Sequence, residues 1–99
     1  MKNKIAPIHP GEILLEEFMK PMDITQYRLA KDLGLPLSRI NQIVLNNRAI
    51  TASTALLLSK YFNLSEEFWL NLQIRFDLET AKDKMKEQLL AVKVVTKAA

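Results

Sequence analysis

The sequence predicts an all-α protein. Apolar residues recur at spacings of three and four along most of the chain, Ser, Thr or His precedes several of these runs, and a Gly34-Leu-Pro36 corner separates two of them. A length of 99 residues suits one domain. With 48% apolar and 25% charged residues, the composition is typical of a globular chain.

A first helix is expected between Pro10 and Pro21, behind an N-terminal arm of residues 1–8. His9 can occupy the N-cap, Pro10 suits the first helical position, and the Glu12 carboxylate can reach back to the cap. This single histidine is interpreted as a cap, because a metal or catalytic site needs several convergent groups. The buried stripe of the helix is expected to contain Ile13, Leu14 and Phe18.

Two short helices are expected on either side of the corner. Thr25 is a natural N-cap for the first, and Gly34 can adopt the left-handed conformation that ends it. Pro36 cannot continue that helix but suits the first turn of the next. Two such helices joined by a short turn are typical of a helix-turn-helix. The inner face of the second helix is expected to be Ile40, Ile43 and Val44.

The outer face of this second helix is polar and lies in a stretch without acids. No acidic residue occurs between Asp32 and Glu66, whereas Arg39, Arg48 and Lys60 are basic. An ordinary helical hairpin with a polar face would also fit the pattern, but the missing carboxylates favour a surface that meets phosphates. The residues expected to face the major groove are Leu37, Ser38, Arg39, Asn41 and Gln42, and those expected near phosphates are Gln26, Asn46, Asn47 and Arg48.

A fourth helix is expected after an N-cap at Thr51, and a fifth after an N-cap at Ser65. The fifth segment carries more large apolar groups than one narrow stripe requires. All of them could complete the monomer core, but aromatic residues are also enriched at interfaces, so a division between core and homodimer contact is favoured. The residues assigned to the dimer interface are Phe68, Trp69, Leu72 and Phe76.

The C-terminal tail, residues 80–99, follows the DNA-binding domain at residues 9–79. Its composition favours another helix to about Lys93, with Met85, Leu89 and Leu90 as its few apolar anchors. The lysines of this tail could touch DNA, but a solvated helix face is the favoured interpretation.

Several classes of function find no support in the sequence. The chain has no cysteine, no phosphate-binding Gly-rich loop, no metal-ligand cluster and no nucleophile paired with a histidine, so we expect no enzyme, cofactor, metal or small-molecule substrate. No apolar run approaches the roughly 20 residues that span a bilayer. The start of the chain lacks a signal-peptide pattern, so a cytoplasmic protein without membrane partners is expected.

The segment "TQYRLAKDLGLPLSRINQIVLNNR" resembles the five-helix, lambda-repressor-like DNA-binding domain of the phage-repressor and Cro class. Together with "HPGEILLEEF", "ITASTALLLSKYF" and "SEEFWLNLQIRFDL", it resembles HigA antitoxins, also called plasmid-maintenance antidote proteins, over about residues 5–80. The resemblance implies a homodimer that binds an inverted-repeat operator, represses its own operon and neutralises a HigB-like (RelE-like) mRNase toxin. A stand-alone transcriptional regulator without a toxin partner is the alternative.

Overall fold

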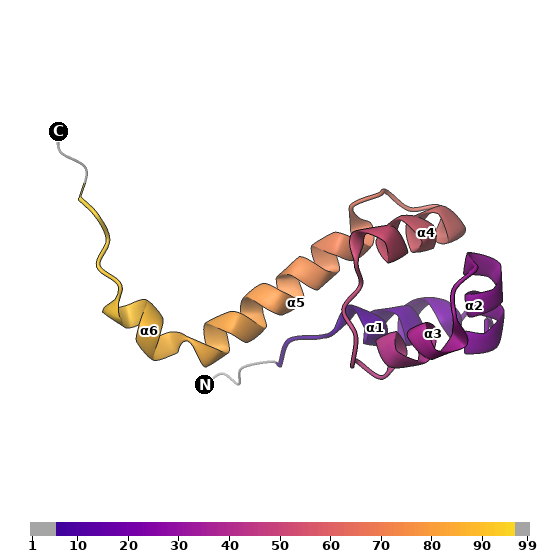
Figure 1. Ribbon diagram of the computed structural model, residues 1–99, viewed down its shortest axis with the longest axis horizontal. Coiled ribbons are helices and arrows are strands. Elements are labelled where there is room, and N and C mark those ends of the chain that lie inside the picture. The colour runs from indigo at the N-terminus through magenta and orange to yellow at the C-terminus, as the bar shows by residue number, and fades with distance from the viewer. Residues whose placement is uncertain (1–5, 97–99) are drawn as a thin grey trace.

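The computed structural model describes residues 6–96, and within this range the regular elements are all helical (Figure 1). The all-α class expected from the sequence is confirmed. The elements are α1 (Pro10–Ile13), the π-helical η1 (Leu14–Met19), α2 (Gln26–Leu33), α3 (Leu37–Val44), α4 (Ala52–Phe62), α5 (Phe68–Lys84) and α6 (Lys86–Ala91).

The helices form a bundle at one end of an elongated molecule. In Figure 1, α1 to α4 lie together at one end, and α5 begins beside α4 and runs away from them towards α6. α2 packs on α3, α4 packs on α5, and α1 contacts both α3 and α5. α3 is therefore held by helices that precede it and lies at the edge of the bundle, where its outer face remains open.

The core lies inside this bundle and draws on every helix except α6. Leu14, Leu29, Ile40, Leu58 and Trp69 have no accessible surface. The remaining buried apolar side chains are Met19, Ala30, Ile43, Val44, Ile50 and Ala55.

The expected N-caps of α2 and α4 and the expected end of α2 are confirmed. The Thr25 hydroxyl accepts a hydrogen bond from the Arg28 N–H at 3.0 Å, and the Thr51 hydroxyl accepts one from the Thr54 N–H at 3.5 Å. Gly34 has φ +72°, in the left-handed region, and ends α2. Pro36, which was expected in the first turn of the next helix, stands just before that turn, at the N-cap of α3.

Two expectations about helix starts and hydrogen bonding need correction. Ser65 does not cap α5; its carbonyl accepts the Phe68 N–H at 3.2 Å, so a turn precedes the helix, which begins at Phe68. The segment after Ile13 is also wider than an α-helix. The Lys20 N–H bonds to the Leu15 carbonyl, five residues earlier, which is the π-helical pattern.

The tail differs from the expectation in its packing. α5 continues to Lys84, so the expected domain boundary at 79/80 falls inside a helix, and α6 ends at Ala91. The expected anchors Met85, Leu89 and Leu90 are all exposed in the monomer, Leu90 at 87%. This prediction of anchoring was wrong because α6 lies beyond the bundle, at the far end of α5 (Figure 1).

Of the expected N-terminal arm, residues 1–5 lie outside the described residues, and Ala6–Ile8 have no helical structure. Within residues 6–96, no helix is both long enough and apolar enough to cross a bilayer.

Candidate DNA interface

The corner between α2 and α3 is fixed by backbone hydrogen bonds on either side of Gly34. The Gly34 N–H donates to the Lys31 carbonyl, and the Leu35 N–H donates to the Ala30 carbonyl at 2.9 Å. This is the bonding of a Schellman motif, which needs a left-handed residue at its centre. The motif and Pro36 together set the direction in which α3 leaves α2.

α3 has one buried face and one open face. Ile40 and Ile43 are fully buried and Val44 nearly so, as expected from their spacing. The expected base-facing residues lie on the accessible side: Leu37, Ser38 and Gln42 are exposed, and Arg39 and Asn41 are half-buried. None of the five is packed into the monomer core, so the polar groups of Ser38, Arg39, Asn41 and Gln42 can meet a ligand.

The loop after α3 brings two of the expected contact residues together. The Arg48 Nε donates to the Gln42 side-chain oxygen at 2.7 Å. Arg48 is exposed and keeps its other guanidinium donors available, so this bond orients the group towards the side of α3 that carries Gln42. A residue expected at phosphates is thus joined to one expected at bases.

Asn46 has a structural task that the sequence interpretation missed. It adopts φ +65° and ends α3, with its N–H donating to the Ile43 carbonyl. The Asn47 N–H donates to the Gln42 carbonyl at 2.9 Å, completing a second Schellman motif. Asn tolerates the left-handed region better than most residues, which could have indicated this role. Asn46 and Asn47 are both exposed, and Gln26 is half-buried at the first position of α2.

α1 approaches the end of α3 so closely that only a glycine fits between them. A β-carbon at Gly11 would collide with the carbonyl of Ile43. The sequence interpretation used this segment only as a helix start, because a contact between residues 11 and 43 leaves no local periodicity. The position of α3 in the bundle therefore depends on the absence of a side chain at Gly11.

His9 connects the start of α1 to α5. Its Nδ1 accepts the Gly11 N–H at 2.8 Å, which confirms the expected cap, and its ring meets Phe76 edge-on with centroids 4.9 Å apart. Burial lowers the pKa of His9 from its ordinary value; the charge of Asp77 and the backbone of Arg48 oppose this shift. Because an Nδ1 that accepts a bond carries no proton, the neutral form is the one that caps the helix.

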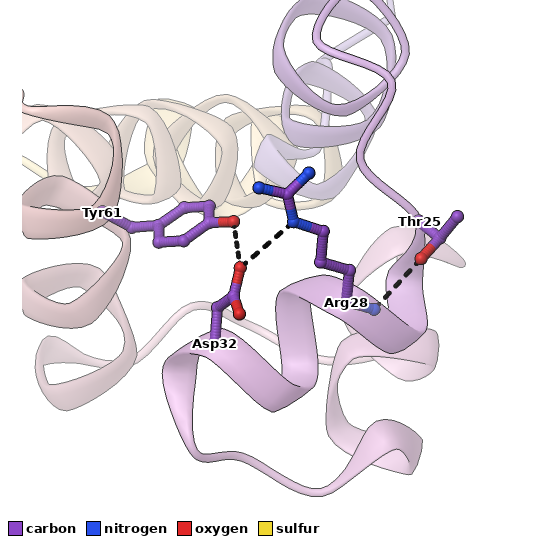
Figure 2. Close-up of polar contacts among 4 residues, drawn as sticks. All are labelled: Thr25, Arg28, Asp32 and Tyr61. Carbon is purple, nitrogen blue, oxygen red and sulfur yellow. Dashed lines mark hydrogen bonds and ion pairs between the residues drawn. The ribbon is translucent and has the colours of Figure 1, made fainter.

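α2 is joined to α4 by a polar cluster of three residues (Figure 2). The Tyr61 hydroxyl and the Arg28 Nε both donate to the same oxygen of Asp32. The Tyr61 bond is the main reason that the pKa of the Asp32 carboxyl is lowered, and the same bond raises the pKa of Tyr61. Asp32, the last acidic residue before the stretch without acids, is therefore hydrogen-bonded within the fold.

The aromatic residues of α5 divide between core and surface, and one assignment needs correction. Trp69, expected at a dimer interface, is fully buried, with its ring centroid 5.0 Å from that of Phe18 and 5.1 Å from that of Phe68. It has no surface to offer a second chain. Phe68, Leu72 and Phe76 are half-buried, whereas Ile74 and Leu78, which were not assigned to the dimer interface, are 59% and 55% exposed.

Comparison with known proteins identifies the family. A family model described as helix-turn-helix matches residues 15–69, which contain the corner and the helices around it. Virulence-associated protein I of Dichelobacter nodosus is 51% identical over 81 residues, covering 82% of this chain and 75% of that protein. The solved structure of the Pseudomonas aeruginosa antitoxin HigA with the higBA promoter matches with a TM-score of 0.87 at 38% identity, covering 91% of this chain and 99% of that one. The chain belongs to the HigA-type helix-turn-helix family.

A second solved structure that matches is that of antitoxin GraA in complex with its operator. It has a TM-score of 0.87 at 40% identity and covers 98% of this chain and 99% of that chain. The likeness to HigA-type structures therefore includes α5 and α6 as well as the helix-turn-helix. The lambda-repressor-like bundle with a C-terminal helical extension, as expected from the sequence, is the fold of this HigA-type chain.

Proposed function

We propose that this HigA-type chain is a sequence-specific DNA-binding repressor of its own operon, working as the antitoxin of a toxin–antitoxin pair. The observation that carries the proposal is the open outer face of α3, which presents Arg39, Asn41 and Gln42 beside a stretch of sequence without acids. Two solved structures of similar fold contain a promoter or an operator. Such a repressor acts where its operon lies, in the cytoplasm.

The proposed contacts divide into base contacts and phosphate contacts. Arg39 can bind guanine with two hydrogen bonds, and Asn41 or Gln42 can pair with adenine, each worth about 1–3 kcal/mol of discrimination. Ser38 can bond to either kind of edge, and Leu37 can contact a thymine methyl. The residues proposed to contact phosphates are Gln26, whose helix N-terminus also points N–H groups outwards, and Asn46, Asn47 and Arg48.

We propose that two copies bind one operator. A two-fold dimer would present two α3 helices roughly 34 Å apart, matching an inverted repeat in successive major grooves. The surface proposed for the dimer is the accessible part of three half-buried residues at four-residue spacing on α5, Phe68, Leu72 and Phe76. Large apolar groups left exposed along one helix favour an interface.

Membership of the HigA-type family supports a toxin-neutralising role for this chain. We propose that the partner is a HigB-like mRNase, bound directly by this chain. We also propose a functional division into an arm at residues 1–8, a DNA-binding part at 9–79 and a tail at 80–99. The last two parts are continuous in the structure, because α5 crosses the boundary between them. Co-purification with the product of an adjacent small gene would support the toxin partner. If no such partner is bound, the chain is a stand-alone regulator.

The test of DNA binding is an electrophoretic shift with the DNA upstream of the gene at two salt concentrations, with random DNA of equal length as competitor. We expect the upstream DNA to bind at least about 10³-fold more tightly, with affinity falling as salt rises. Equal binding of upstream and random DNA would overturn the repressor role.

A further inference from the structure

The loop that carries Arg48 is held at its far end by α5. Ile50, near the end of the loop between α3 and α4, is 2% exposed, and its N–H donates to the side-chain oxygen of Gln73 at 2.8 Å. Gln73 is itself buried and lies 23 residues further along the chain. A buried N–H that lost this acceptor would stay unpaired, so the bond specifies where the loop runs.

The other end of the Gln73 amide is used as well. Its Nε2 donates to the Asp77 Oδ1 at 2.9 Å, one turn further along α5. With its oxygen on Ile50 and its nitrogen on Asp77, the amide has one favoured orientation. The carboxylate acceptor strengthens that orientation, because hydrogen bonds to charged groups are stronger than neutral ones.

The near end of the same loop is held by α3. Gln42 accepts the Asn47 N–H with its backbone carbonyl and the Arg48 Nε with its side chain. Arg48 therefore stands between two fixed points of the loop, its bond to Gln42 on α3 and the bond of Ile50 to Gln73 on α5. A change at the Gln73 end would leave the loop held by α3 and by the hydrogen bond between His9 and the Arg48 backbone.

We infer that Gln73 is a positioning residue of the DNA interface. It sets the loop that presents Arg48 to a phosphate and connects that loop to the helix proposed to form the dimer. This inference rests on the proposed DNA-binding function, and it assigns to Gln73 no contact with DNA. The connection also means that a change in α5 at Gln73 reaches the loop directly.

The test compares Gln73→Met, which keeps the shape and removes both hydrogen bonds, with Arg48→Ala in the full-length chain. Affinities for upstream and random DNA are measured across salt concentrations, well below the unfolding temperature of each variant. We expect Gln73→Met to weaken binding to both DNAs about tenfold, or about 1.4 kcal/mol, and to make the salt slope shallower by about one. Arg48→Ala should do the same, and Gln73→Met should add less than about twofold in the Arg48→Ala background.

A rescue variant separates positioning from stability. Gln73→Glu combined with Asp77→Asn exchanges donor and acceptor without changing the net charge, and still offers an oxygen to the Ile50 N–H. We expect the pair to regain the wild-type affinity and salt slope, and the Ile50 amide to be protected from hydrogen exchange in the rescue variant but not in Gln73→Met. Gln88→Met, on the exposed surface of α6, is the matched control and should match the wild type.

The outcomes are distinct. Wild-type affinity and salt slope in folded Gln73→Met would overturn the inference, even if its melting temperature fell. Full additivity with Arg48→Ala would also overturn it. A wild-type chain that binds upstream and random DNA equally would overturn the proposed function, and this inference with it.

Discussion

The carbonyl oxygen of Ile43 lies 1.8 Å from the point that a β-carbon on Gly11 would occupy. Two non-bonded heavy atoms cannot come that close. The first turn of α1 and the last turn of α3 therefore touch backbone to backbone. Because Ile43 belongs to the buried face of α3, this contact fixes how deeply the helix sits in the bundle. The orientation of the proposed DNA-reading face therefore depends on Gly11, a residue 32 positions before Ile43.

We predict that Gly11→Ala destabilises the fold by about 3 kcal/mol, because a backbone clash can be relieved only by moving a helix. Gly34→Ala is the matched control. Its β-carbon would have no described atom within 4 Å, so only the left-handed φ of +72° costs free energy, about 1 kcal/mol. Urea denaturation of both variants measures the difference. Equal losses would show that α1 and α3 do not meet in this way.

Arg39→Ala is expected to weaken binding to the upstream DNA at least about tenfold while changing binding to random DNA much less, because a base contact is lost. Competition binding at fixed salt measures both affinities. Arg75→Ala removes an equal charge from the exposed surface of α5, where Arg75 pairs with Glu79, and should leave the ratio unchanged. A parallel loss on both DNAs in Arg39→Ala would assign this residue to phosphates instead.

We predict that His9 makes stability depend on pH. Burial lowers its pKa in the folded state below the ordinary 6.5, so the unfolded chain takes up the proton first as the pH falls. The stability that neutral His9 contributes is therefore complete above about pH 6.5 and is lost as the pH falls through the folded-state pKa.

Urea midpoints measured from about pH 7.5 to about pH 5 test this prediction, since most carboxylates titrate below that range. His9→Asn keeps an acceptor for the Gly11 N–H but cannot titrate, and it loses the ring contact with Phe76. The variant should be less stable at pH 7.5 and show a flatter pH dependence. An identical pH dependence in both proteins would exclude His9 as its source.

Trp69→Ala is expected to cost about 3–5 kcal/mol of folding stability, because it empties a fully buried site. The Trp69 Nε1 has no hydrogen-bond partner among the described residues, so Trp69→Phe loses no hydrogen bond and should cost much less. Thermal unfolding and sedimentation of the two variants measure stability and mass. If the Trp69→Ala protein had an unchanged melting temperature and half the mass, Trp69 would have to be assigned to the dimer interface and not to the core.

The local features of this protein could be predicted from local sequence. Thr25 and Thr51 cap the helices that follow them, and Gly34 ends α2, because caps and left-handed turns depend on one residue and its immediate neighbours. The buried Ile40, Ile43 and Val44 follow from helical spacing alone. The same spacing placed Arg39 and Gln42 on the accessible side of α3.

The features that were missed depend on pairs of residues far apart in the chain. The Gly11 contact with Ile43 and the Gln73 bond to Ile50 leave no periodic pattern, since each joins two distant segments of the chain at a single point. Trp69 and Leu90 show the same limit for apolar residues. Hydrophobicity marks both as suited to burial, yet one fills the core and the other is 87% exposed.

By itself, the sequence determined that the chain is helical, where its corner lies and which face of α3 is polar, because these properties are set within a few turns of chain. Only the tertiary structure decided which apolar residues of α5 and α6 are buried, and how α1 and α5 hold α3 and its loop in place. Burial and close approach depend on what packs opposite a residue, and that partner lies elsewhere in the chain.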